Sequence, residues 1–466
     1  MSRSSWIDDL RRDVVLAGRQ MIRTPTFTLV AVATIALGIG ANSAIFALAD
    51  ATLLRPLPLP APDRLVALWE RTPEGERGLA SPLNLVDWDD RAQTLDAAAG
   101  YAPGVGAMVM SGADGLSETV PRQWVTARFF DVLGARPIAG RTFTAADDTR
   151  GTRAVVMTES FWRRRFNGDR AVVGQPLRLD GDPYIVVGIV PDECQLLGRT
   201  SLWALAVNDR RPVLRRAHAL LAIGRLTSGA TIEAARADVN AVADALAREF
   251  PDTNAGRGVT IEPLQSSVVG ADLRRTALLL LAVVAVVVLI CCVNVASLLL
   301  TRATARGSEL AIRVALGASR SRVIRQLVTE SVVLALAGGV LGALVAMAIL
   351  AAAPSVLPPD LLPPSVVVTF DPRVALFCAM TTVLVGVLFG AAPAWQSTGV
   401  APAQAIASDS RTVTGRGGRL RRVLVGGEVA IAVLLLVGAG LLLRTLLAVN
   451  GVDRGYGASN VLTLMV

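Results

Sequence analysis

Residues 276–353 decide the fold of this chain. They read TALLLLAVVAVVVLICCVNVASLLL (276–300), TRATARGSELAIRVALGASRSRVIRQ (301–326) and LVTESVVLALAGGVLGALVAMAILAAA (327–353). The first and last runs are apolar, and each is longer than the roughly 20 residues that a helix needs to cross a bilayer. The segment between them is short and rich in arginine. The pattern predicts two membrane-spanning helices joined by a charged segment on one side of the membrane.

The charged segment 301–326 has the periodicity of an amphipathic helix. Leu310 and Val314 lie on its predicted apolar side. Glu309 and Arg313 form its predicted ion pair, and Gly317 is its predicted end. An i, i+4 pair of opposite charges stabilises a helix surface by a few tenths of a kcal/mol, so a plain surface role is the alternative to a docking role. We expect these five residues to contact a partner or to brace this helix.

The composition is that of a membrane protein. Of 466 residues, 52% are hydrophobic, and the mean hydropathy is +0.51, which is too apolar for a soluble protein of this size. The net charge of +8 comes from arginine alone, because the sequence contains no lysine. A Walker A motif needs a lysine at the phosphates, so these residues contain no P-loop ATPase of the usual kind. We predict that the chain is not an enzyme.

The sequence predicts no metal, cofactor or nucleic-acid site. Its four cysteines show no CxxC pattern, and its single histidine, His218, is interpreted as an ordinary residue of the soluble part. The arginines flank apolar runs and do not alternate with aromatic residues, as they would on a nucleic-acid surface. The expected surroundings of the chain are therefore a lipid bilayer.

Arginine is distributed unevenly around the apolar runs, and this predicts the topology. Segments 1–25, 301–326 and 398–422 are short and arginine-rich, whereas the loop 354–373 contains a single arginine. The positive-inside rule places the three arginine-rich segments in the cytosol. The amino terminus is then cytosolic and the large region 55–275 is extracytoplasmic.

The whole chain is thus predicted to contain five spans. The expected order is a cytosolic amphipathic helix (1–25), TM1 with a stalk (26–54), an extracytoplasmic core domain (55–275), TM2 (276–300), a cytosolic coupling helix (301–326), TM3 (327–353), an outer loop (354–373), TM4 (374–397), a cytosolic linker (398–422), TM5 (423–447) and the start of a second outer domain (448–466).

The extracytoplasmic region reads as an α+β fold. Runs 184–190, 219–226 and 258–263 are predicted strands, and 232–250 is a predicted helix capped by Thr231. Helices on one face of a small sheet fit this order.

Several polar and small residues carry further expectations. Three aspartates, Asp87, Asp89 and Asp90, are interpreted as a solvated loop, and Asn42 and Asp50 are expected where water reaches the outer half of TM1. Small residues in TM3 and TM4, at Gly338 and Gly342 and at Gly386 and Gly390, predict close packing of these two helices.

Several motifs resemble a known family. The run ELAIRVALGAS (309–319), the pair ES (330–331) and the run GGVLG (338–342) resemble the signature region of MacB-type (FtsX-like) ABC transporter permeases. The motifs SPLN and DW (81–88), RFFDVLG and GRTF (128–143), and FWRRRF with LDGDPY (161–184) are similar to the periplasmic core domain of these permeases.

A narrower resemblance concerns the duplicated orphan permeases called ADOP. It rests on GIGAN (38–42) and LRPL (54–57). In that subfamily, residues 448–466 would open a second outer domain followed by three further spans. We therefore expect the chain to be a truncated or split product that covers the first repeat plus one helix.

The resemblance implies a function and its partners. It implies a permease subunit of an ABC-type export or mechanotransmission system in the bacterial inner membrane, active in efflux. A separate cytosolic ATPase subunit would dock on 301–326, and the permease would pair with a second copy as a homodimer or with a second permease half. A periplasmic adaptor is a further implied partner. The alternative is a transmembrane signalling or scaffold protein whose outer domain binds a ligand or regulates a cell-envelope enzyme.

Overall fold

Two units make up the fold of this protein. The computed structural model describes residues 3–111, 117–149, 153–196, 198–206, 212–305, 320–356, 366, 368–397 and part of 426–444. The helical unit comprises Met1–Ala49, Leu278–Ala353 and Thr369–Val466, and the α+β unit comprises Asp50–Ala277 and Pro354–Val368. The fold class, transmembrane helices with an α+β domain, is as predicted.

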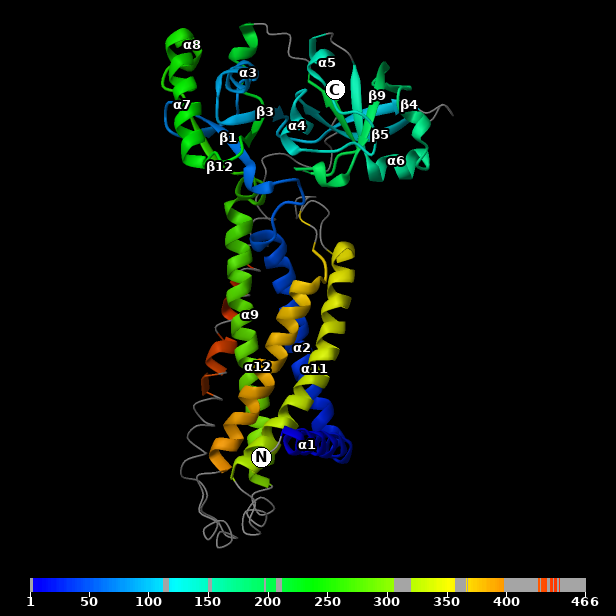
Figure 1. The fold of residues 1–466 in the computed structure, drawn as a ribbon, viewed down its shortest axis with the longest axis vertical. Coiled ribbons are helices and arrows are strands. Elements are labelled where there is room, and N and C mark those ends of the chain that lie inside the picture. The colour runs from blue at the N-terminus through cyan, green and yellow to red at the C-terminus, as the bar shows by residue number, and fades with distance from the viewer. Residues whose placement is uncertain are drawn as a thin grey trace. The chain divides into compact units, whose positions relative to one another are not determined.

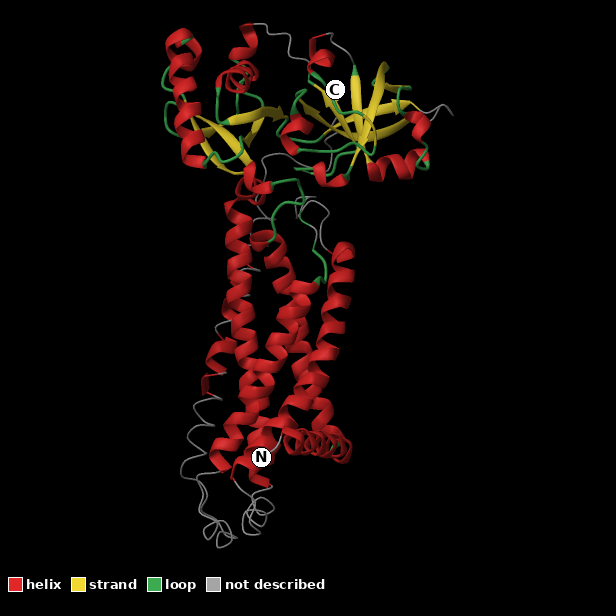
Figure 2. Cartoon of the chain, in the orientation of Figure 1, coloured by secondary structure: helices red, strands yellow, loops and turns green. Residues whose placement is uncertain are grey.

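The helical unit is built from long helices, and all of them except the amphipathic α1 are mainly apolar (Figures 1 and 2). They are α1 (Arg3–Arg23), α2 (Pro25–Ala49), α9 (Leu264–Ala305, which begins in the α+β unit), α11 (Arg320–Val356) and α12 (Pro372–Ser397). Helix α1 lies crosswise at one end of the others (Figure 1). A stacked pair of rings, Phe46 and Phe377, joins α2 to α12 with centroids 4.1 Å apart.

Three helices among the described residues are long and apolar enough to cross a membrane. They lie at Pro25–Leu54, Asp272–Cys291 and Ile324–Ser355. Shorter apolar helices, at Pro372–Leu388 and Val429–Gly438, fall where the fourth and fifth spans are predicted.

The helices expose large apolar side chains along their length. Examples are Leu37 of α2 (63% exposed), Leu279 of α9 (68%), Val340 of α11 (67%) and Met380 of α12 (64%). So much exposed apolar surface is unfavourable in water and suits contact with lipid chains.

Among its described residues, the α+β unit contains one sheet of twelve strands. The strands are β1 (Leu65–Arg71), β2 (Arg77–Gly78), β3 (Leu95–Tyr101), β4 (Gly106–Ser111), β5 (Ser117–Val125), β6 (Ala139–Gly140), β7 (Ala154–Thr158), β8 (Pro176–Leu179), β9 (Asp182–Val190), β10 (Leu202–Leu205), β11 (Leu221–Leu226) and β12 (Gly258–Pro263). The helices are α3 (Pro82–Arg91), α4 (Phe129–Leu133), α5 (Ala145–Thr149), α6 (Glu159–Phe166), α7 (Ile232–Glu249) and α8 (Pro251–Asn254).

The strand order divides this sheet into two parts. The path β10-β7-β9-β8-β4-β5 closes on itself, because β10 also pairs in parallel with β5. A single pair, Tyr101 with Val125, then connects β5 to the antiparallel strands β3-β11-β1-β12. Helices α3 and α7 cover the second part and bury Trp88, Val239 and Leu246 against it.

The strands and helix predicted in this region are confirmed. The predicted runs correspond to β9, β11 and β12, and α7 occupies Ile232–Glu249. Its cap is also as predicted, since Thr231 Oγ1 accepts a hydrogen bond from the Ala234 N–H at 3.2 Å.

The interpretation of the three aspartates as a loop is wrong. They lie on α3, whose first turn is capped by Ser81 and begins with Pro82. Asp87 pairs with Arg215 at 2.8 Å, and Asp89 pairs with Arg128 at 2.7 Å. Both arginines are distant in sequence, so local spacing gave no sign of these ion pairs.

The expected hydration of Asn42 and Asp50 is also wrong. Each residue is 1% exposed. Asp50 opens a turn of π-helix (Asp50–Leu54), and its Oδ2 lies 3.4 Å from Arg55 Nη2. The predicted span 26–54 therefore changes its winding at Asp50.

One ion pair makes the stability of the α+β unit depend on pH. Asp147 accepts from Arg141 Nη1 at 2.6 Å and Nη2 at 2.9 Å, and from the Thr144 N–H at 2.9 Å. The hydrogen bonds from Arg141 lower the pKa of Asp147 to about 2. Because the folded pKa lies below the unfolded one, this contribution is present above about pH 4 and is lost as the pH falls to about 2.

We therefore predict that Asp147→Asn lowers the free energy of unfolding by about 1–3 kcal/mol at neutral pH. The difference from the unchanged protein should shrink between about pH 4 and pH 2, where that protein also loses the ionised carboxylate. Intrinsic fluorescence during denaturant unfolding of the full chain in lipid nanodiscs measures this difference. The exposed Asp252 provides the control, as Asp252→Asn. A difference that does not change with pH would contradict the assignment.

Candidate coupling site

The residues predicted to contact an ATPase lie outside the described residues. These residues are Glu309, Leu310, Arg313, Val314 and Gly317. The structure describes the two ends of the predicted segment 301–326. Residues 301–305 continue α9, and residues 320–326 open α11.

A buried carboxylate connects α1 to the beginning of α11. Asp13 of α1 is 1% exposed, and its Oδ2 accepts from Arg325 Nε at 3.1 Å. The other oxygen, Oδ1, lies 3.7 Å from Arg322 Nη2. An ion pair with a buried member is strongly destabilising to break, because a charge then remains without its partner. The first turns of α11 and the middle of α1 are thus held together.

Sequence reasoning missed this contact, although one signal was present. Asp13 stands on the same side of α1 as Ala17 and Gln20, at positions i, i+4 and i+7. A carboxylate on the inward side of an amphipathic helix needs a cationic partner. The sequence alone could not identify that partner among the many arginines.

Close packing at glycines brings α2, α11 and α12 together. A methyl group at Gly338 would lie 2.6 Å from Ile35 Cγ2, and one at Gly342 would lie 3.1 Å from the Ala36 carbonyl oxygen. Both glycines therefore face α2. The expectation that they pack against α12 is not met, because α11 contacts α2 along this side.

The contact between α11 and α12 uses other residues of α11. A methyl group at Gly386 of α12 would lie 3.0 Å from Ala335 Cβ of α11, and Gly339 of α11 faces Thr382 of α12. Gly390 lies on α12, and its surroundings are outside the described side chains. Gly339 is one residue from Gly338 and therefore points about 100° away around the helix.

Two glycines of α2 complete this packing. A methyl group at Gly38 would lie 2.5 Å from Cys291 Sγ of α9, and one at Gly40 would lie 2.9 Å from the Gly342 carbonyl oxygen of α11. Both glycines belong to the motif GIGAN (38–42). Its glycines let α2 approach two neighbours at once.

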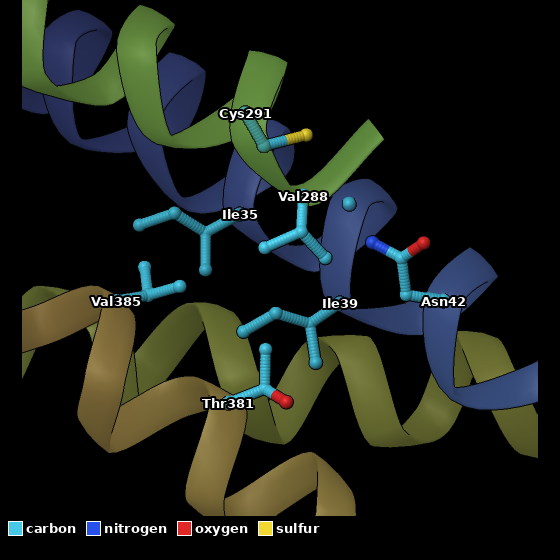
Figure 3. Close-up of a pocket in the computed structure, with 8 residues that line it drawn as sticks. Ile35, Ile39, Asn42, Val288, Cys291, Thr381 and Val385 are labelled. Atoms are coloured by element: carbon cyan, nitrogen blue, oxygen red, sulfur yellow. The ribbon is translucent and has the colours of Figure 1, made fainter. Parts of the chain in front are cut away.

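A small cavity lies between α2, α9 and α12 (Figure 3). Its lining residues are Ile35, Gly38, Ile39, Asn42, Val288, Cys291, Thr381 and Val385. Nδ2 of Asn42 is buried and has no hydrogen-bond partner among the described residues. The cavity offers about 10 Å³ to a water-sized molecule, which is roughly the space of one water and too small for a transported substrate.

A second polar cluster, in the α+β unit, has a structural role. Glu70 is 1% exposed, and its Oε1 lies 3.2 Å from Arg257 Nη1 and 3.3 Å from His218 Nδ1. Its Oε2 accepts from the Ser81 N–H at 3.1 Å and from Asn84 Nδ2 at 3.4 Å. Both carboxylate oxygens are occupied, and the cluster fastens α3 to β1.

Within the part of the chain that the structure describes, no group of three or more His, Cys, Asp or Glu residues has the arrangement to bind a metal ion.

Two family models match the chain. Residues 28–242 match the model described as a MacB-like periplasmic core domain, and residues 281–402 match the FtsX-like permease C-terminal model. The first match begins in α2 and includes most of the α+β unit, and the second includes α11 and α12.

Curated relatives are similar to more than half of the chain. The probable syringafactin export ATP-binding/permease protein SyfD of Pseudomonas syringae pv. tomato is 27% identical over 288 residues, which is 61% of this chain and 42% of the relative. The macrolide export ATP-binding/permease protein MacB of Chromobacterium violaceum is 27% identical over 285 residues, 60% of this chain and 42% of the relative. The matches thus span about two fifths of the relatives' own length.

Among solved structures, the periplasmic region of MacB from Actinobacillus actinomycetemcomitans aligns with a TM-score of 0.33 and 13% identity. That alignment covers 44% of this chain and 90% of the other.

We predict that Asp13→Asn releases α1 from α11. Removing one member of a buried ion pair should lower the free energy of unfolding of the helical unit by roughly 3–5 kcal/mol. Thermal unfolding of the full chain in nanodiscs measures the loss, and the exposed Asp272 provides the matched control as Asp272→Asn. The charge exchange Asp13→Arg with Arg325→Asp should recover part of the loss, and equal midpoints for Asp13→Asn and the unchanged protein would contradict the contact.

Proposed function

We propose that this chain, which belongs to the MacB-type (FtsX-like) permeases, is the membrane subunit of an ABC-type export system driven by a separate cytosolic ATPase. The relatives described above are named as ATP-binding/permease export proteins, and their similarity to this chain covers 42% of their length. The chain contains no lysine for a P-loop. These 466 residues therefore lack a P-loop of the usual kind, and we propose that a partner polypeptide hydrolyses ATP.

The contact of Asp13 with α11 is the observation that best supports coupling. Helix α11 begins at Arg320, within the segment 301–326 that is expected to receive the ATPase, and Arg325 is close to that beginning. A displacement of this end of α11 would move α1 as well. It would also move α2, because α1 ends at Arg23 and α2 begins at Pro25.

The chain continues from these helices into the α+β unit. Helix α2 leads through Asp50–Leu54 toward β1, and α9 begins at Leu264, directly after β12. Movement of the helices would therefore act on the α+β unit through both connections. This arrangement supports mechanotransmission, in which the extracytoplasmic domain moves while no lumen opens across the bilayer.

The predicted spans contain few charged residues that could form a polar route for a substrate. Segments 276–300 and 374–397 contain no charged residue, and 327–353 contains only Glu330. Intramembrane charges usually mark the pathways of ions and polar substrates. We infer that the substrate is already outside when the extracytoplasmic domain acts on it, and that a homodimer partner or second permease half and a periplasmic adaptor complete the system.

We also propose a cytosolic amino terminus, an extracytoplasmic α+β unit and a bacterial inner-membrane location, because arginine is concentrated in the three segments named above. An engineered cysteine at the exposed Ser111 should then react with an impermeant maleimide from outside, whereas one at Ser308 should not. The native Cys194 should not react with the maleimide, because it is buried and burial raises the pKa of its thiol to about 12. Outside labelling at Ser308→Cys would reverse the proposed orientation.

The function itself is tested at the segment 301–326. Leu310→Asp and Val314→Asp place charge on its predicted apolar side, and Glu309→Arg and Arg313→Glu test the ion pair. If the pair is buried against the ATPase, each single reversal should weaken association by about 2–5 kcal/mol, against a few tenths for an exposed pair.

The measurements are co-purification of the cognate ATPase and its permease-stimulated ATP hydrolysis in membranes. Ser308→Asp adds the same charge on the opposite side of the predicted helix and serves as the control. Unchanged binding and stimulation in all four variants would reject the coupling role and favour a signalling or scaffold protein.

A further inference from the structure

Helix α1 presents two adjacent stripes away from the rest of the helical unit. One stripe is apolar and exposes Val15 (49%) and Ile22 (80%), seven residues apart. The other consists of arginines at positions 12, 19 and 23, all exposed. Residues at i, i+7 and i+11 share one side of a helix, so these arginines form a continuous cationic edge beside the apolar stripe.

None of the arginines of this edge forms an ion pair among the residues that the structure describes, and the same holds for Arg11. The ion pairs between α1 and α11 are formed by Asp13, which lies on the inward side of α1. The charge of the cationic edge is therefore available for a partner outside the helical unit.

The position of α1 in the chain selects that partner. Helix α1 ends at Arg23, and the apolar span Pro25–Leu54 begins two residues later. The last turn of α1 must then lie at the level where a bilayer passes from hydrocarbon to headgroups. A helix with an apolar stripe beside a cationic one lies in this layer, with its apolar side toward the acyl chains.

We propose that α1 carries a binding surface for anionic lipid headgroups, formed by Arg12, Arg19 and Arg23 beside Val15 and Ile22. Guanidinium groups bind phosphate oxygens through paired hydrogen bonds, and the apolar stripe holds the helix at the depth of those phosphates. A second copy of α1 fits this surface poorly, because its own cationic edge would be repelled. The surface follows from membrane insertion alone and does not depend on an ATPase partner.

A titration of the full purified chain tests the proposal. The protein in neutral detergent micelles is titrated with pyrene-labelled phosphatidylglycerol, and binding is followed by energy transfer from tryptophan. The triple variant Arg12→Gln, Arg19→Gln, Arg23→Gln should bind this lipid more weakly, by roughly fivefold for each arginine removed. The matched triple exchange of the same positions to lysine keeps the charge but loses the paired hydrogen bonds, so its binding should lie between that of the glutamine variant and that of the unchanged protein. Pyrene-labelled phosphatidylcholine should bind weakly and equally to all three proteins.

Several outcomes would overturn the proposal. One is equal phosphatidylglycerol binding by the glutamine variant and the unchanged protein, and another is competition by millimolar inorganic phosphate, which would indicate a site for free anions. A third is a smaller oligomer in light scattering with unchanged lipid binding, which would assign the surface to a second copy. Equal thermal midpoints show that the variant is folded, and if the triple variant fails this check, Arg19→Gln and Arg23→Gln are tested singly. ATPase binding enters none of these measurements, so their failure leaves the coupling proposal untouched.

Discussion

The close approach of α2 to its neighbours is the constraint on which the helical unit depends. Lipid chains are as apolar as leucine, so helices in a bilayer associate through van der Waals contact and not through the hydrophobic effect. At Gly40 the backbones of α2 and α11 come so near that a methyl group would lie 2.9 Å from the Gly342 carbonyl oxygen. At Gly38 the same helix meets Cys291 of α9. Because α2 is the centre of these contacts, its position fixes that of α9 and α11.

The buried ion pair at Asp13 restricts how α1 and α11 can be aligned in this packing. Apolar and glycine contacts tolerate small shifts of one helix along another, whereas a carboxylate 3.1 Å from Arg325 Nε is satisfied in one arrangement only. Burial of a charge usually contributes little net stability, and its common effect is to specify a geometry. Here the specified geometry is that between α1 and the start of α11. The amphipathic helix is therefore part of the helical framework and not a loose amino-terminal extension.

Local patterns in the sequence were sufficient for part of the fold. Helix α7 has a threonine cap and a regular apolar side, and β9 is a compact apolar run, so each was predictable from its own residues. Helix α3 was missed because its aspartates find their arginines far along the chain. The closure of β10 on β5 joins residues about 80 positions apart in parallel, and no local pattern encodes such a pairing.

The same distinction holds for the candidate site. The small-residue spacing of α11 predicted that this helix packs closely, but Gly338 and Gly339 face different neighbours, and spacing does not say which. Asp13 and Arg325 are 312 residues apart in sequence. Sequence periodicity identifies which side of a helix is buried, whereas the identity of the partner depends on how the helices are arranged in space.

Two of the connections between the helices and the α+β unit share a departure from α-helical geometry. The first, Asp50–Leu54, is wound as a π-helix, and the second contains Gly270 with φ of 71°. Sharp changes in a helix arise at such π-turns and glycines. Inside the α+β unit the two connections are joined, since Gln265 Nε2 donates to the Arg55 carbonyl at 2.7 Å. A hydrogen bond within the α+β unit thus links the residue that follows the π-turn to the helix that contains Gly270.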